Sequence, residues 1–149
     1  MLNNYLRRTN GLTQNVVDGN NVLFNGLGES YNIVSTPPQI IYDENTGIFT
    51  INTIGVYGVA WNVSILPDIA STYIGLYFQQ ITPTSVYQGG TTTPVQVADG
   101  LTISGNSIFV NSIVGATYAL VVASDLSATI TTSSFIKSES GSIIIYQMQ

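Results

Sequence analysis

The sequence predicts an all-β sandwich or barrel. Apolar and polar residues alternate along several short stretches, and turn residues separate these stretches. No stretch shows the three-to-four-residue apolar period of a helix. Many short strands at regular spacing are typical of a sandwich or barrel. A length of 149 residues favours one domain, which can hold a core without disulfides or metals.

The clearest alternation lies between residues 41 and 65. A polar turn over Asp43–Gly47 precedes a run over 48–51, and Gly55 separates it from a second run over 56–65. Successive side chains of a strand point to opposite faces, so the second run has one bulky face and one small, partly polar face. We expect the bulky face to lie in the core together with the first run, and we assign to the core Phe49, Val59, Trp61 and Val63.

The remaining strands are expected at 22–24, 30–34, 73–81, 85–87, 95–98, 101–103, 108–110, 118–123, 128–131 and 142–146. Gly105–Asn106 predicts a hairpin turn between two of them. Residues 1–21 are polar and interrupted by Asn10-Gly11 and Asp18-Gly19, so we interpret them as an N-terminal arm or stalk remnant, or as a strand that pairs with a partner subunit. Residues 22–149 would then form the head domain.

The composition excludes several classes of function. Charged residues make up 7% of the chain, against about 25% in ordinary soluble domains, and the net charge is -5. Such a chain cannot neutralise phosphates, which argues against nucleic acid, and no run of about 18 apolar residues predicts membrane insertion. A neutral polar surface suits a durable structural protein, or a platform for a neutral ligand such as a glycan.

The chain lacks most of the side chains that enzymes use for catalysis. There is no Cys and no His, which excludes thiol nucleophiles, imidazole metal sites and serine–histidine relays. A carboxylate pair could come from Asp68, Asp99 and Asp125, but each has a turn-forming neighbour and is interpreted as a turn residue. Asp43–Asn45 could offer oxygen ligands to Ca²⁺, although the spacing is not that of an EF-hand. We therefore predict no catalytic residue, no metal site and no cofactor.

An internal sequence similarity and a sequence motif indicate which all-β fold the chain adopts. Residues 48–57 and 108–118 both have the pattern of a strand, a corner that contains glycine, and a second strand. Two such corners are expected in a jelly roll. The stretch YDENTGIFT at 42–50, followed by IGVY at 54–57, resembles the motif of the complement-one-q/TNF-like superfamily of head domains. The segments LTI at 101–103 and GSIIIY at 141–146 resemble later strands of that superfamily, and residues 61–64 and 105–118 resemble bacterial members.

This resemblance implies a ten-stranded jelly-roll sandwich that assembles as a compact homotrimer. In the superfamily such heads end collagen-like stalks and act as trimerisation and adhesion modules, so the resemblance implies an extracellular protein at a spore or cell surface. The chain itself contains no Gly-X-Y repeat. The alternative is a carbohydrate- or receptor-binding jelly roll such as a phage fibre tip. A glycan or a host surface protein is a candidate partner in either case.

Some runs are apolar on both faces, which predicts an interface. These runs are 48–49, 118–123 and 143–145, and the sequence offers no helix to cover the second face. Self-association is the simplest cover. Ile144 lies in one of these runs, and the resemblance places Tyr57 and Tyr146 near the three-fold axis. The alternative is that these side chains pack inside the core of their own subunit.

Overall fold

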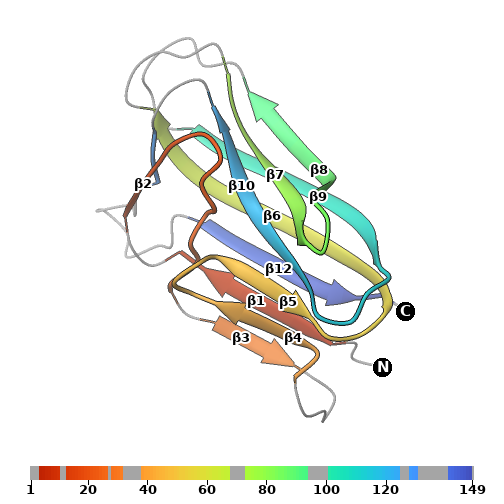
Figure 1. Cartoon of the computed structure of the whole chain (residues 1–149). Coiled ribbons are helices and arrows are strands. Elements are labelled where there is room, and N and C mark those ends of the chain that lie inside the picture. The colour runs from red at the N-terminus through yellow and green to blue at the C-terminus, as the bar shows by residue number, and fades with distance from the viewer. Residues whose placement is uncertain are drawn as a thin grey trace.

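The computed structural model describes residues 4–10, 13–26, 28–31, 38–67, 73–93, 101–124, 128–130 and 141–148. Over these ranges the chain forms two antiparallel sheets and no helix. The sheets lie face to face (Figure 1), which makes the molecule a sandwich as the alternation predicts.

The larger sheet, sheet A, has β6 at its centre. Its neighbouring strands, in spatial order, are β3 (Gly28–Tyr31), β1 (Tyr5–Thr9), β12 (Gly141–Gln147), β6 (Gly55–Pro67) and β9 (Leu101–Asn111). The far end of β6 also pairs with β11 (Ala128–Ile130), which in turn pairs with β2 (Gln14–Val16). Thirteen residues make β6 long enough to pair with β9 along one side and with two strands along the other.

Sheet B contains the other five strands. Their order is β4 (Ile40–Asp43), β5 (Ile48–Ile51), β10 (Ala116–Ser124), β7 (Ile74–Thr82) and β8 (Val86–Thr93). Neighbours in both sheets are mostly far apart in sequence, which is the jelly-roll arrangement. The two similar segments are the corners β5–β6 and β9–β10, so each carries the chain from one sheet to the other.

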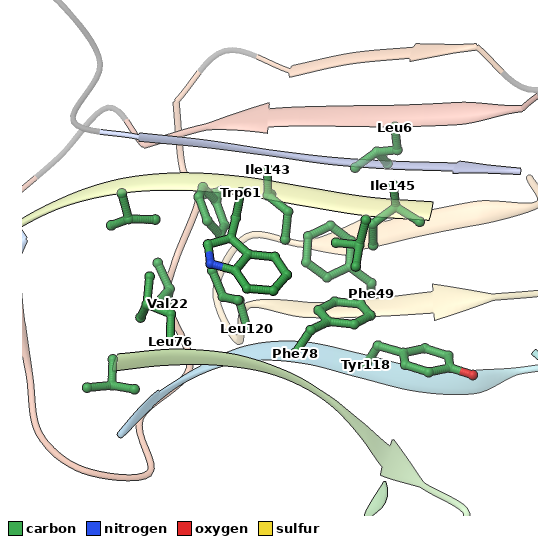
Figure 2. Packing of buried hydrophobic residues seen from close by; sticks show 14 of the residues in the cluster. Leu6, Val22, Phe49, Trp61, Leu76, Phe78, Tyr118, Leu120, Ile143 and Ile145 are labelled. Carbon is green, nitrogen blue, oxygen red and sulfur yellow. The ribbon is translucent and has the colours of Figure 1, made fainter. Parts of the chain in front are cut away.

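The core lies between the inner faces of the two sheets. Phe49, Val59, Trp61 and Val63 are all buried there, on the face that the alternation assigned to them. Figure 2 shows the indole of Trp61 between strands of sheet A and the side chains of sheet B, with Phe78 and Leu120 on the opposite side. Nearly all buried residues of the described chain are apolar, so hydrophobic burial is the main stabilising term.

The sandwich is closed along one edge by side chains instead of a backbone ladder. β8 of sheet B runs beside β9 of sheet A. Thr91 Oγ1 donates to the carbonyl oxygen of Ser104 (2.9 Å), and Ser107 Oγ donates to that of Gln88 (2.5 Å). These bonds satisfy carbonyl groups on otherwise open edges, and an open edge would offer a template for pairing with another chain.

The structure corrects the assignment of residues 1–21 to an arm. Residues 5–9 form β1, an interior strand of sheet A between β12 and β3, and Leu6 is buried. Residues 14–16 form β2. Both strands pair within their own chain, so residue 21 marks no domain boundary. The short segment 22–24 was expected to be a strand, but only Asn21 beside it makes a bridge, to Val121.

The hairpin expected at Gly105–Asn106 is also wrong. β9 runs straight through these residues, and Gly105 pairs with Trp61. A Cβ atom on Gly105 would lie 2.3 Å from Cζ2 of Trp61 and 2.4 Å from Oγ1 of Thr91. Glycine is therefore needed at this position because the indole and β8 pack directly against the backbone, not because the chain turns. Expected strand 95–98 lies outside the described residues, as do Asp68, Asp99 and Asp125.

One end of the core holds a cluster of aromatic rings with a polar centre. The rings of Phe78 and Tyr118 stack with centroids 5.6 Å apart, and Phe109 lies against both. Tyr118 Oη donates to Asn111 Oδ1 (2.8 Å), and Asn111 Nδ2 donates to the carbonyl oxygen of Thr53 (2.7 Å). Asn111 is fully buried, so these bonds supply the partners that its amide would otherwise take from water.

We predict that Tyr118→Phe lowers the free energy of unfolding by about 1–3 kcal/mol. The ring keeps its packing, but the buried Oδ1 of Asn111 loses the donor at 2.8 Å and keeps its desolvation cost. The matched control is Tyr87→Phe, because Tyr87 is exposed and its loss of a hydroxyl should change stability by less than about 0.5 kcal/mol. Urea unfolding measures both, and equal midpoints for the two variants would contradict the assigned bond.

We also predict that stability is flat near neutral pH and falls in strong alkali. Burial raises the pKa of Tyr118 to about 12, with a smaller contribution from Tyr57, and burial raises the pKa of Tyr42 to about 12. The unfolded value is about 10, so the folded state binds these protons more tightly and loses stability as pH rises from about 10 to 12. Tyr118 alone should contribute a slope of about 1.4 kcal/mol per pH unit.

With no His and no Cys, the chain lacks the side chains whose ordinary pKa values lie nearest neutrality, so the unfolding midpoint should be constant between about pH 6 and 9. Urea unfolding at fixed protein concentration across pH 6 to 12 is the measurement. A midpoint that climbs above pH 10 would show that these tyrosines titrate more easily when folded than when unfolded.

Candidate self-association surface

The outer face of sheet A carries an apolar surface that no other part of the described chain covers. The register places Tyr146 of β12, Gly58 of β6 and Ile108 of β9 in one row across the sheet. Ile144, Ala60 and Asn106 form the next row. We define the apolar surface by the larger outward side chains of these three strands and the residue that follows β12: Val56, Ile108, Val110, Ile144, Tyr146 and Met148.

The side chains of this surface are apolar, yet several of them are largely exposed. Ile108 and Val110 are 63% and 62% exposed, and Tyr146 and Met148 are 37% and 39% exposed. Ile54 and Val114, which lie just before β6 and just after β9, extend the apolar area at the same end of the sheet. Single exposed apolar residues are ordinary, but a contiguous group usually marks an interface.

The surface is also free of charge. None of the residues in β6, β9 and β12 is acidic or basic. Arg7 of β1, opposite Ile144, is the nearest charged position on this face among the strand pairings described. A partner docking here would bury no ion on these three strands, so no charge desolvation opposes association. The polar end of the same face, toward Asn62 and Ser142, supplies neutral hydrogen-bonding groups.

Gly58 allows Tyr146 to lie on the sheet. A Cβ atom at Gly58 would meet Cζ of Tyr146 at 2.2 Å and its hydroxyl oxygen at 2.4 Å, so the phenol ring lies directly over the glycine. A side chain there would push the ring outward and change the shape of the surface. The pair thus fixes how close the Tyr146 ring lies to the sheet at the centre of this face.

The structure separates the three residues that were predicted to lie at an interface. Ile144 and Tyr146 point outward on the apolar surface, where an interface could include them. Tyr57 does not: it is fully buried, its ring stacks with Phe109 at 5.8 Å, and its hydroxyl bonds to Thr53. Placing Tyr57 at the interface is therefore wrong for this chain. Tyr57 lies on the inner face of β6, in the same alternation as Trp61.

The two-faced run at 118–123 also has a different explanation. Its outward residues Ala119 and Val121 are buried within the single chain. The backbone of residues 19–22 bonds to this part of β10, including Val22 N–H to the carbonyl oxygen of Leu120 (2.8 Å). This run therefore needs no partner subunit.

The acidic cluster considered for Ca²⁺ is occupied by turn bonds. Asp43 Oδ1 accepts the backbone N–H of Asn45, and Oδ2 accepts the hydroxyl of Thr46, both at 2.9 Å. The N–H bond is the main reason that the pKa of Asp43 is lowered. Glu44 pairs with Arg8 at 2.8 Å. Within the described ranges no group of three or more acidic, histidine or cysteine side chains could hold a metal ion, and no helix there could span a membrane.

Comparisons with known proteins show the fold. No protein-family profile matches the sequence, and no curated protein does. Among solved structures, the globular domain of zebrafish complement 1qA protein matches with a TM-score of 0.63 and 12% identity, over 99% of this chain and 98% of that chain. The structure of Eiger TNF from S. frugiperda matches with a TM-score of 0.70 and 11% identity, over 99% and 93%.

Murine APRIL at pH 5.0 matches with a TM-score of 0.64 and 8% identity, over 97% of this chain and 98% of that chain. At such identities a match shows the fold alone. The chain therefore has the complement-1q/TNF-like jelly-roll fold that its motif at 42–57 indicated.

Proposed function

We propose that this chain is a non-enzymatic head module that assembles as a homotrimer through the outer face of sheet A. In this role it is displayed outside the cell as the trimerisation and adhesion tip of a filament on a spore or cell surface. The observation that carries the proposal is the uncharged apolar surface centred on Ile108, Val110 and Tyr146. Its large exposed side chains require a cover, and the same face of two further copies, converging on a three-fold axis, is the simplest cover of matching chemistry.

Two further features support three-fold assembly. The superfamily motif at 42–57 implies a homotrimer, and the fold is that of complement-1q and TNF structures. Only 7% of the residues in the whole chain are charged, so the exterior is mostly neutral and polar. Such an exterior suits a displayed module that is exposed to different salt concentrations and to different surfaces. Ion pairs are scarce, so salt has little to screen, and the one ion pair within the described residues, Arg8–Glu44, is partly exposed.

The experiment is light scattering coupled to gel filtration across a micromolar dilution series. We expect a mass of about 48 kDa, which is three times the chain mass of 15.9 kDa. A soluble species of about 16 kDa at all concentrations would overturn self-association, and a stable species of about 32 kDa would overturn the three-fold symmetry while keeping the surface.

A further inference from the structure

A hollow on the outer face of sheet B, on the opposite side of the sandwich from the apolar surface, has the chemistry of a sugar-binding site. Its volume is about 370 Å³, near the lower end of the range for small-ligand pockets. Three strands contribute to it: Tyr77 from β7, Tyr87 from β8 and Ala123 from β10. We propose that this hollow binds a neutral saccharide residue.

The register shows how the strands around the hollow are aligned. Ala123, Gly75 and Thr92 are partners in one row across β10, β7 and β8, and Gly90 is the partner of Tyr77 in the next row. Gly90 and Ala123 line the hollow with little or no side chain, whereas Thr92 packs over Gly75 and the Cβ of Tyr77 packs over Gly90. The phenol rings of Tyr77 and Tyr87 bound this hollow, with centroids 6.2 Å apart and planes inclined by 36°.

The two tyrosine rings provide the apolar contact surface for a sugar ring. Tyr87 is 64% exposed, so its ring face is open to a ligand, while Tyr77 is half-buried and fixed against the strand. A pyranose ring has an apolar face of C–H groups that packs on such a ring, and burying an aromatic face against it removes apolar area from water. The opposite edge of the same sugar carries hydroxyl groups that need hydrogen-bonding partners.

Polar groups at the rim can supply those partners. Thr92 lines the hollow. Asp18 is not one of the lining residues, but its Oδ1 accepts the N–H of Ser124 at 3.0 Å, and Ser124 follows Ala123 on β10. Asp18 is also near enough to Tyr77 to raise the pKa of its phenol, after the larger effect of burial. A carboxylate accepts sugar hydroxyls well and repels anions, so the site favours neutral sugars over acidic ones.

An organic cation is the competing ligand for a pair of tyrosines beside a carboxylate. Binding of a cation by aromatic rings gains most where the ion loses its water. The 64% exposure of Tyr87 leaves the site open on that side, so a cation would keep much of its hydration. The geometry therefore favours a flat, neutral ligand that needs one stacking surface and a few hydrogen bonds.

The position of the hollow suits a displayed module. It lies on sheet B, so assembly through sheet A would leave one copy open on every subunit. A single site of this size and exposure should bind a monosaccharide with a Kd on the order of a millimolar. Several copies on one assembly raise the affinity for a glycan-coated surface without any new contact. Only this gain in avidity rests on the proposed trimer.

The test is saturation-transfer NMR of the intact chain with methyl glycosides of glucose, galactose, mannose and N-acetylglucosamine, with choline and sialic acid as comparison ligands. We expect transfer to the C–H face of at least one neutral glycoside. Tyr87→Ala should weaken its binding by about tenfold or more, and Tyr87→Phe should retain it. Val86→Ala is the matched control, since Val86 is exposed on the same strand and does not line the hollow.

Thermal unfolding of each variant checks that the fold is intact, and Thr92→Val tests the hydrogen-bonding rim with the same readout. Absence of transfer to every neutral glycoside would overturn the proposal. Equal binding by Tyr87→Ala and wild type, or a preference for choline, would overturn it too. Free glycosides are monovalent, so these results do not depend on the mass found by light scattering.

Discussion

Trp61→Ala is expected to lower the free energy of unfolding by about 3–5 kcal/mol, the range for truncating a large buried aromatic side chain. The indole is 3% exposed and lies between the sheets, where it packs against the backbone of Gly105. Its removal loses the transfer free energy of the ring and leaves a cavity. Domains of this size are stable by about 5–15 kcal/mol in total, so the loss is a large fraction of the whole.

Two readouts check this prediction at one fixed protein concentration. Urea unfolding followed by circular dichroism gives the free energy of the variant. In the wild type, Trp61 is the single tryptophan, so its fluorescence should shift to longer wavelength on unfolding. Val86→Ala is the control because Val86 is exposed on β8 of sheet B, away from the proposed interface. A Trp61→Ala protein as stable as that control would show that the indole is not between the sheets.

The same strand shows what a sequence can reveal. Side-chain direction alternates strictly along a strand, so the bulky residues from Tyr57 to Ile65 could be assigned to one buried face without knowing any partner. That assignment holds for β6 from Tyr57 to Ile65. The strand's neighbours could not be assigned in this way, because β12 and β9 come from distant parts of the chain and local patterns carry no information on pairing.

The N-terminal segment illustrates this limit. YLRRT at 5–9 is short and largely polar, so its pattern does not separate an arm from a strand. It is ordered by pairing with residues 142–146, which lie at the other end of the chain. The turn expected at Gly105–Asn106 failed for another reason. Glycine is required both where a chain turns and where another group packs on the backbone, and the sequence does not distinguish these two uses.

That error also hid part of the candidate surface. With β9 interrupted at residue 105, the outward direction of Ile108 and Val110 could not be seen, although both lie in a strictly alternating strand. Ile144 and Tyr146 were found because the run 143–145 is apolar on both faces. The hollow on sheet B could not be predicted from the sequence, because its lining residues Tyr77, Tyr87 and Ala123 come from three different strands.

Ile108→Lys is expected to abolish self-association and give a species of about 16 kDa where the wild type gives about 48 kDa. Ile108 is 63% exposed in the single chain, so a lysine there should leave the fold of the subunit intact. In the assembly the ammonium group would be buried without a partner on an uncharged surface, at a cost of several kcal/mol. Rotational symmetry places the same charge in every subunit, so the penalty is repeated and the like charges repel.

Lysine is chosen over an acidic residue because it changes the net charge from -5 to -4 (−5 + 1), so stronger overall repulsion cannot explain dissociation. Ile41→Lys is the matched control, since Ile41 is 39% exposed but lies on β4 of sheet B. Light scattering and circular dichroism are measured on both variants. The surface is assigned wrongly if Ile108→Lys keeps the wild-type mass, or if Ile41→Lys dissociates the assembly equally well, because the interface would then not be confined to the outer face of sheet A.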